Sequence, residues 1–88
     1  PELNEIAEFS IFPNPVKDKL YIQFRQNHIS DFEISIFSAL GLKMKTLDFS
    51  TELSNQEISI DMKTFSPGVY FVEIGNTEHK YVRKIVVF

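Results

Sequence analysis

The stretch Ser66–Phe88 reads SPGVYFVEIGNTEHKYVRKIVVF and decides the fold predicted for this chain. Its two ends are rich in β-branched and aromatic residues, and they flank the short polar segment GNTEH. Such residues favour strands, and a short polar connection between two strands is typical of a β-hairpin. We therefore predict a hairpin whose second strand runs to Phe88. Because uncovered chain ends usually fray, the apolar run Ile85–Phe88 needs cover from the domain itself or from a partner protein.

Three segments before this hairpin alternate apolar and polar residues, namely 18–24, 31–38 and 56–62. A period of two residues is typical of a strand with one buried face. The inward residues predicted there are Leu20, Ile22, Phe24, Phe32, Ile34, Ile36, Ile58, Ile60 and Met62. The segments 9–12 and 42–49 complete the series. In the second, the apolar residues change face midway, so we expect a β-bulge near Lys45 or Thr46. Seven short β segments without helical periodicity predict an all-β fold, an immunoglobulin-like antiparallel β-sandwich of about seven strands.

Proline and glycine mark the expected turns. The tripeptide Pro13-Asn14-Pro15 fixes φ twice and lacks two backbone donors, so strand pairing is expected to stop or to switch sheets there. Gly41 is available for a positive φ in the connection Ala39-Leu40-Gly41, which predicts a second hairpin. Gly68 follows Pro67, as in a type II turn. The hydroxyl of nearby Tyr70 is expected to reach a backbone carbonyl, since a buried tyrosine usually has a hydrogen-bond partner.

The composition restricts the class of protein. The chain has 88 residues, no cysteine, 43% hydrophobic and 14% aromatic residues, so one small core must hold the fold without disulfides. A net charge of −3 disfavours a nucleic-acid partner. The longest apolar run, Ile85–Phe88, is too short to span a membrane. Residues 1–8 are polar and acidic and lack the basic start of a signal peptide. We expect them to be the end of a linker from a larger protein, with the domain over residues 9–88.

Four local patterns, in the same order along the chain, resemble the C-terminal sorting domain, type A, of the type IX (Por) secretion system. The first is Pro13-Asn14-Pro15 followed by Lys17, Asp18, Leu20 and Ile22, and the second is the segment Ile34–Gly41. The third is Ser66-Pro67-Gly68-Val69-Tyr70, and the last comprises Lys80, Arg83, Lys84, Val86 and Val87. The resemblance covers about Phe9–Phe88 and implies a seven-stranded immunoglobulin-like sandwich. The chain departs from the pattern at Phe88, where many relatives end in Lys or Arg.

The resemblance implies that the domain is an address. In this family a cargo protein first reaches the periplasm by a separate N-terminal signal peptide. Its C-terminal sorting domain then directs it through an outer-membrane translocon, where a shuttle protein binds the domain. A surface sortase commonly cleaves just before the domain and joins the cargo to anionic lipopolysaccharide. The implied partners are therefore the translocon, the shuttle protein, the sortase and an upstream cargo domain in the same chain, with the cargo in transit through the periplasm and then at the cell surface or secreted.

The residues that match the family motifs each have a structural and a functional interpretation. Gly68 and Tyr70 are turn and core residues or part of the recognised motif. The cations at 80, 83 and 84 protect an edge strand or steer the domain to a negatively charged receptor. The run Ile85–Phe88 packs in the core or adds as a strand to a partner's sheet. The predicted recognition residues are Gly68, Tyr70, Lys80, Arg83, Lys84, Ile85, Val86, Val87 and Phe88, and the predicted structural motif residues are Pro13, Asn14, Pro15 and Gly41.

Catalysis and metal binding have little support in the sequence. His28 and His79 are single histidines in separate loops, and the chain has no cysteine, so a metal site is not expected. No Ser-His-Asp ordering, phosphate loop or carboxylate pair in a recognisable context occurs. We therefore predict that the domain is not an enzyme and needs no cofactor.

Two other functions fit the same fold. One is a carbohydrate-binding or adhesive sandwich appended to a secreted enzyme, with Tyr21, Phe37 and Phe71 as candidate exposed aromatics. The absence of tryptophan weakens this alternative. The other is a structural spacer, for which truncation of the last strand changes stability and leaves localisation unchanged.

Overall fold

The computed structural model describes residues 9–25, 32–49, 57–76 and 79–88. Over these ranges the chain forms seven strands: β1 Phe9–Phe12, β2 Lys19–Phe24, β3 Phe32–Ser38, β4 Lys43–Phe49, β5 Glu57–Asp61, β6 Gly68–Gly75 and β7 Lys80–Val87. The predicted linker 1–8 and the predicted polar loops 26–30 and 50–55 lie outside the described residues. The described ranges contain no helix with the length and apolar character needed to cross a membrane.

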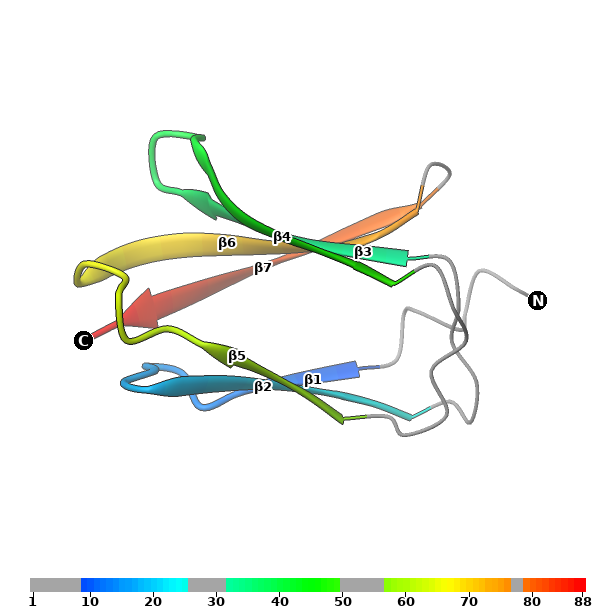
Figure 1. The fold of residues 1–88 in the computed structure, drawn as a ribbon, viewed down its shortest axis with the longest axis horizontal. Helices are drawn as coiled ribbons and strands as arrows, with labels where there is room; N and C mark the ends of the chain where they lie inside the picture. Colours follow the sequence, from blue (N-terminus) through cyan, green and yellow to red (C-terminus); the bar gives the residue numbers. More distant parts are fainter. Residues whose placement is uncertain (1–8, 26–31, 50–56, 77–78) are drawn as a thin grey trace.

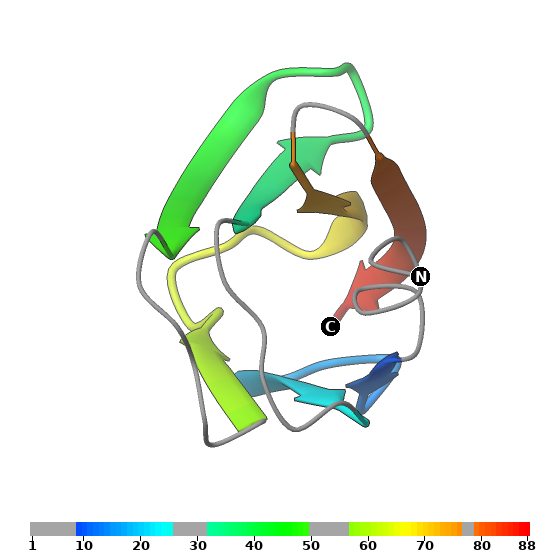
Figure 2. The same cartoon turned by 90° about the vertical axis from the view of Figure 1, so that its right-hand side faces the viewer.

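The strands form two antiparallel sheets that pack face to face. One sheet has the order β1-β2-β5 and the other the order β4-β3-β6-β7. Figure 1 shows the two layers from the side, and Figure 2 shows them after a quarter turn. The predicted all-β, immunoglobulin-like sandwich is confirmed.

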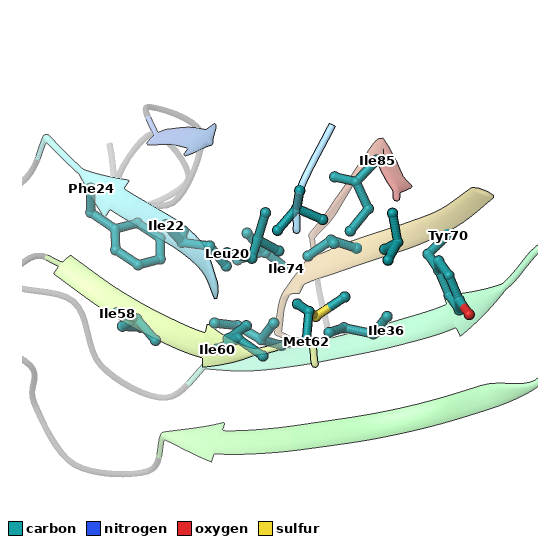
Figure 3. Close-up of a cluster of buried hydrophobic side chains, with 14 of the residues drawn as sticks. Leu20, Ile22, Phe24, Ile36, Ile58, Ile60, Met62, Tyr70, Ile74 and Ile85 are labelled. Atoms are coloured by element: carbon teal, nitrogen blue, oxygen red, sulfur yellow. The ribbon is translucent and has the colours of Figure 1, made fainter. Parts of the chain in front are cut away.

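The core lies between the sheets and follows the predicted alternation. All nine residues expected to point inward from β2, β3 and the β5 segment are buried, with at most 9% of any one exposed. The remaining core residues come mainly from β6 and β7, and Figure 3 shows side chains of both layers meeting. Full burial of such a side chain contributes about 1.5–3 kcal/mol to stability, so the alternation supplies the main force that holds the layers together.

The β3–β4 hairpin forms around Gly41, as predicted. Gly41 has a φ of +90°, its N–H donates to the Ser38 carbonyl at 2.9 Å, and the Ser38 N–H donates to the Leu42 carbonyl at 2.8 Å. The strand register changes between the pairs Ile36↔Lys45 and Phe37↔Lys43, so Met44 is an extra residue on β4. The expected β-bulge therefore exists, one residue before the predicted position.

The type II turn predicted at Pro67-Gly68 is wrong. Gly68 does adopt a positive φ, but its value of +150° is far from the value of about +80° that the third position of such a turn requires. The reason lies in the sheet, because Gly68 already belongs to β6 and pairs with Val87. Its extended backbone starts the strand instead of closing a turn.

We predict that Gly75→Ala destabilises the fold by about 1–3 kcal/mol, because a methyl group there overfills a packed site. Gly75 is buried between its strand partners Glu33 and Lys80, and an added Cβ collides with the His79 carbonyl oxygen and lies 2.7 Å from the Lys80 Cα. Urea unfolding measures the change. Ser59→Ala, on the exposed face of β5, is the control and should unfold like the wild type. Equal unfolding midpoints for all three proteins would contradict the prediction.

Candidate recognition site on the last strand

Strand β7 is docked in the domain's own sheet. It lies at one edge of the four-stranded sheet and pairs with β6 from Lys80↔Gly75 to Val87↔Gly68. Ile85 and Val87 point into the core, with 1% and 3% of their surfaces exposed. The apolar end of the chain is therefore covered by the domain itself.

The second half of β7 also has a neighbour on its other side. The Val16 N–H donates to the Val86 carbonyl at 2.7 Å, and the Phe88 N–H donates to the Val16 carbonyl at 3.0 Å. These bonds form an isolated parallel bridge between Val16 and Val87. Strand pairing stops at Pro13–Pro15, as predicted, but the predicted change of sheet is wrong: β1 before the corner and β2 after it pair with each other in one sheet, and Val16 between them makes an isolated bridge to the other sheet.

Asn14 extends this contact through its side chain. The Asn14 Oδ1 accepts a hydrogen bond from the Val86 N–H at 2.9 Å, and the Asn14 Nδ2 donates to the Lys84 carbonyl at 3.1 Å. One amide group therefore offers β7 the acceptor and the donor that a neighbouring strand would offer. We call Asn14 and Val16 the edge clamp. From the sequence we expected Asn14 to act only in the corner, and we did not single out Val16. The signal that could have identified Val16 is an apolar residue placed between Pro15 and the polar pair Lys17-Asp18.

The three cations of β7 do not form one cluster. Lys80 and Lys84 share the outer face of the sheet, where the Lys80 Nζ lies 3.9 Å from the Glu73 carboxylate. Arg83 has the opposite orientation, and its guanidinium carbon lies 4.7 Å from the centre of the Phe9 ring on β1. Arg83 thus bridges the two sheets at their edge by a cation–π contact. The exposed Lys80–Glu73 pair contributes little to stability, so Lys80 remains available at the surface.

Tyr70 is a core residue with a satisfied hydroxyl. Its side chain is buried, its O–H donates to the Ser66 carbonyl at 2.7 Å, and its ring packs edge-on against Phe65 with 5.3 Å between ring centres. The predicted bond to a backbone carbonyl is confirmed. Tyr70 therefore fixes the segment that leads into β6, next to the end of β7.

The aromatics considered for a sugar site lie on two different sheets. Phe37 and Phe71 are direct cross-strand partners of β3 and β6 on the outer face of the four-stranded sheet. Tyr21 lies on β2 in the other sheet and stacks on Phe12, with 5.7 Å between ring centres. The three rings therefore form no common platform. In the part of the chain that the structure describes, no three His, Cys, Asp or Glu side chains gather where they could hold a metal ion.

The fold and the site together define a small β-sandwich module that presents an edge strand. Residues 10–88 match the sequence model of the family described as the secretion system C-terminal sorting domain. The chain belongs to this family, the C-terminal sorting domains of type IX secretion. The family consists of sorting signals and not of enzymes, and membership implies type IX secretion machinery, a cargo in the same chain and export across the outer membrane. A comparison with curated proteins gave no match.

We predict that Asn14→Ala exposes the edge of β7. The variant loses both side-chain bonds to β7, and unfolding should become easier by about 1–2 kcal/mol. Hydrogen exchange at the Val86 amide should accelerate more than exchange at Val72, which lies in the middle of the sheet. Asn14→Asp tests the two bonds separately, because it keeps the acceptor for Val86 and loses the donor to Lys84. Gln23→Ala, which removes an exposed amide on β2, is the control. Unchanged Val86 exchange in Asn14→Ala would contradict the role of the clamp.

Proposed function

We propose that residues 9–88 are the C-terminal signal by which the type IX machinery exports an upstream cargo, and that β7 is the element that the machinery reads. The family match over residues 10–88 is the observation that carries this proposal. The position of β7 at a sheet edge supports it, because the exposed side chains of an edge strand are accessible to a partner.

Energetics favour recognition of β7 in its docked state. Its release would expose Ile85 and Val87 and would break the four hydrogen bonds of the edge clamp. The two side chains contribute about 1.5–3 kcal/mol each and each hydrogen bond about 0.5–1.5 kcal/mol, so release costs roughly 5–12 kcal/mol. That is comparable to the whole stability of a small domain. We infer that the strand is read while it is folded.

This inference divides the predicted recognition residues into two groups. Lys80, Lys84 and Phe88 are exposed and Val86 is partly exposed, so these side chains can meet a partner directly. The others act by holding β7 in place: Gly68, Tyr70, Ile85 and Val87 through the sheet and core, and Arg83 through Phe9. A partner surface with negative charge complements the two lysines.

The later steps of export follow the family. We propose that residues 1–8 are the end of the linker to the cargo and that a surface sortase cleaves before the domain. The cargo would pass through the periplasm and the translocon with a shuttle protein, and would then be joined to lipopolysaccharide or released.

We predict that the domain transfers sorting to a passenger. Residues 1–88 are fused behind a periplasmic signal peptide and a fluorescent passenger in a type IX-competent bacterium. Fluorescence should reach the surface or the medium, and removal of Lys84–Phe88 should leave it in the periplasm. Surface fluorescence without those residues would contradict the proposal.

Truncation also removes core residues, so a second variant keeps the fold. Lys80→Glu with Lys84→Glu reverses two exposed charges on β7 and should lower export by about tenfold, the effect of losing about 1.4 kcal/mol of binding. Lys19→Glu with Lys63→Glu makes the same charge change away from β7 and should export normally. Equal export of both double variants would show that β7 is not the element read.

A further inference from the structure

The tip of the β3–β4 hairpin exposes three large apolar side chains within five residues. The exposed fractions are 90% for Leu40, 64% for Leu42 and 50% for Met44. Scattered exposed apolar residues are common on soluble domains, but a contiguous group marks an interaction surface. These three residues, with Lys43 and Lys45 between and beside them, are called the hairpin tip here.

The β-bulge moves Lys43 to the outer face of the sheet, beside the exposed apolar side chains. Further along β4, Leu47 packs against the core, and strict alternation from Leu47 would place residue 43 on the same inner face. The extra residue Met44 breaks this register opposite Ile36 and Phe37. Bulges bend a strand and redirect its side chains. The regular register of β4 is therefore interrupted at Met44, the last of the three exposed apolar residues.

The charges around the tip are positive. No acidic residue occurs in the sequence between Glu33 and Asp48, whereas Lys43 and Lys45 lie within the tip. The Lys43 Nζ is 5.7 Å from the centre of the Phe37 ring, so this lysine lies over an aromatic side chain at the base of the hairpin. The tip therefore adds two cationic side chains to its apolar ones, Lys43 on the outer face beside Phe37 and Lys45 on the other face of β4, opposite Ile36.

The shape of the tip favours a fluid surface over a shaped groove. Figure 1 shows the hairpin connection standing off the side of the four-stranded sheet that faces away from the other sheet. Apolar side chains on a projecting turn can enter the boundary between headgroups and acyl chains, while neighbouring lysines keep their ammonium groups at the level of anionic headgroups. We propose that the hairpin tip docks on the surface of a bilayer that contains anionic phospholipid.

This contact goes beyond the sorting function and is compatible with it. In the sheet order β4-β3-β6-β7, the hairpin strand β4 and the recognition strand β7 are opposite edges, separated by β3 and β6. A domain that rests on a membrane by its hairpin keeps β7 open to a protein partner.

Vesicle co-sedimentation of the 88-residue chain tests the proposal. The chain should bind vesicles of equimolar phosphatidylglycerol and phosphatidylcholine, and should not bind vesicles of phosphatidylcholine alone. Leu40→Ser with Leu42→Ser should abolish binding. Lys43→Gln with Lys45→Gln should weaken it by about tenfold or more, since each lysine near an anionic surface contributes about 1 kcal/mol. Higher salt should weaken the binding of the wild type, because screening reduces the attraction.

Matched controls separate this site from general charge effects. Lys19→Gln with Lys63→Gln removes the same charge outside the hairpin and should change binding by less than about twofold if each lysine acts only within a Debye length of the surface. Thermal melts of all variants confirm folding, and Leu40→Ser alone, at the most exposed position, replaces the double variant if that variant melts early. Equal binding to both vesicle types, no binding, or unchanged binding of the leucine variant would each overturn the proposal.

The sorting assay distinguishes a lipid from a protein occupant. If the wild type ignores both vesicles while the leucine variant still fails to export the passenger, the hairpin tip contacts a protein, and the lipid proposal is overturned while the sorting function stands. If vesicles bind as expected and the passenger is not exported by the wild type, the sorting function fails and the membrane contact stands.

Discussion

Hydrogen bonds on both sides of β7 hold the first turn and the last strand of the domain together. On one side β6 pairs along the whole strand, and on the other Asn14 and Val16 bind its second half. An edge strand with unpaired backbone groups frays and invites foreign pairing. Because the edge clamp satisfies these groups, Ile85 and Val87 can remain in the core and close the space between the two sheets. The first turn of the domain and its last strand thus stabilise each other.

This arrangement bears on how a folded domain can act as a signal. A signal that must be unfolded to be read would have to overcome the burial of β7 at each recognition event. A signal read on the folded surface needs only that the correct side chains are held in position. The alternation of β7 provides this, because Lys80 and Lys84 lie outward while Ile85 and Val87 anchor the strand. Core residues and surface residues of the same motif therefore have different physical roles.

The two edges of the four-stranded sheet differ in chemistry. At β7 the exposed residues are Lys80, Val82, Arg83 and Lys84 on a regular strand, which suits a specific protein partner. At β4 a bulge interrupts the register, and the hairpin that follows β3 exposes leucines beside lysines. Since both edges belong to one rigid sheet, contact at one edge sets the orientation of the other. The fold can therefore combine the proposed recognition strand with the proposed membrane contact without added length.

Residues close together in the chain were enough to predict the strands, the inward faces of β2, β3 and β5, the positive φ of Gly41 and the bond from the Tyr70 hydroxyl, because each of these features is local. Three features could be found only in the folded domain: Asn14 binds β7 across 70 residues, Arg83 points away from Lys80 and Lys84, and Gly68 starts a strand. These features depend on which strands become neighbours and in what register. Local periodicity carries no information on that choice, which is made by the packing of the two sheets.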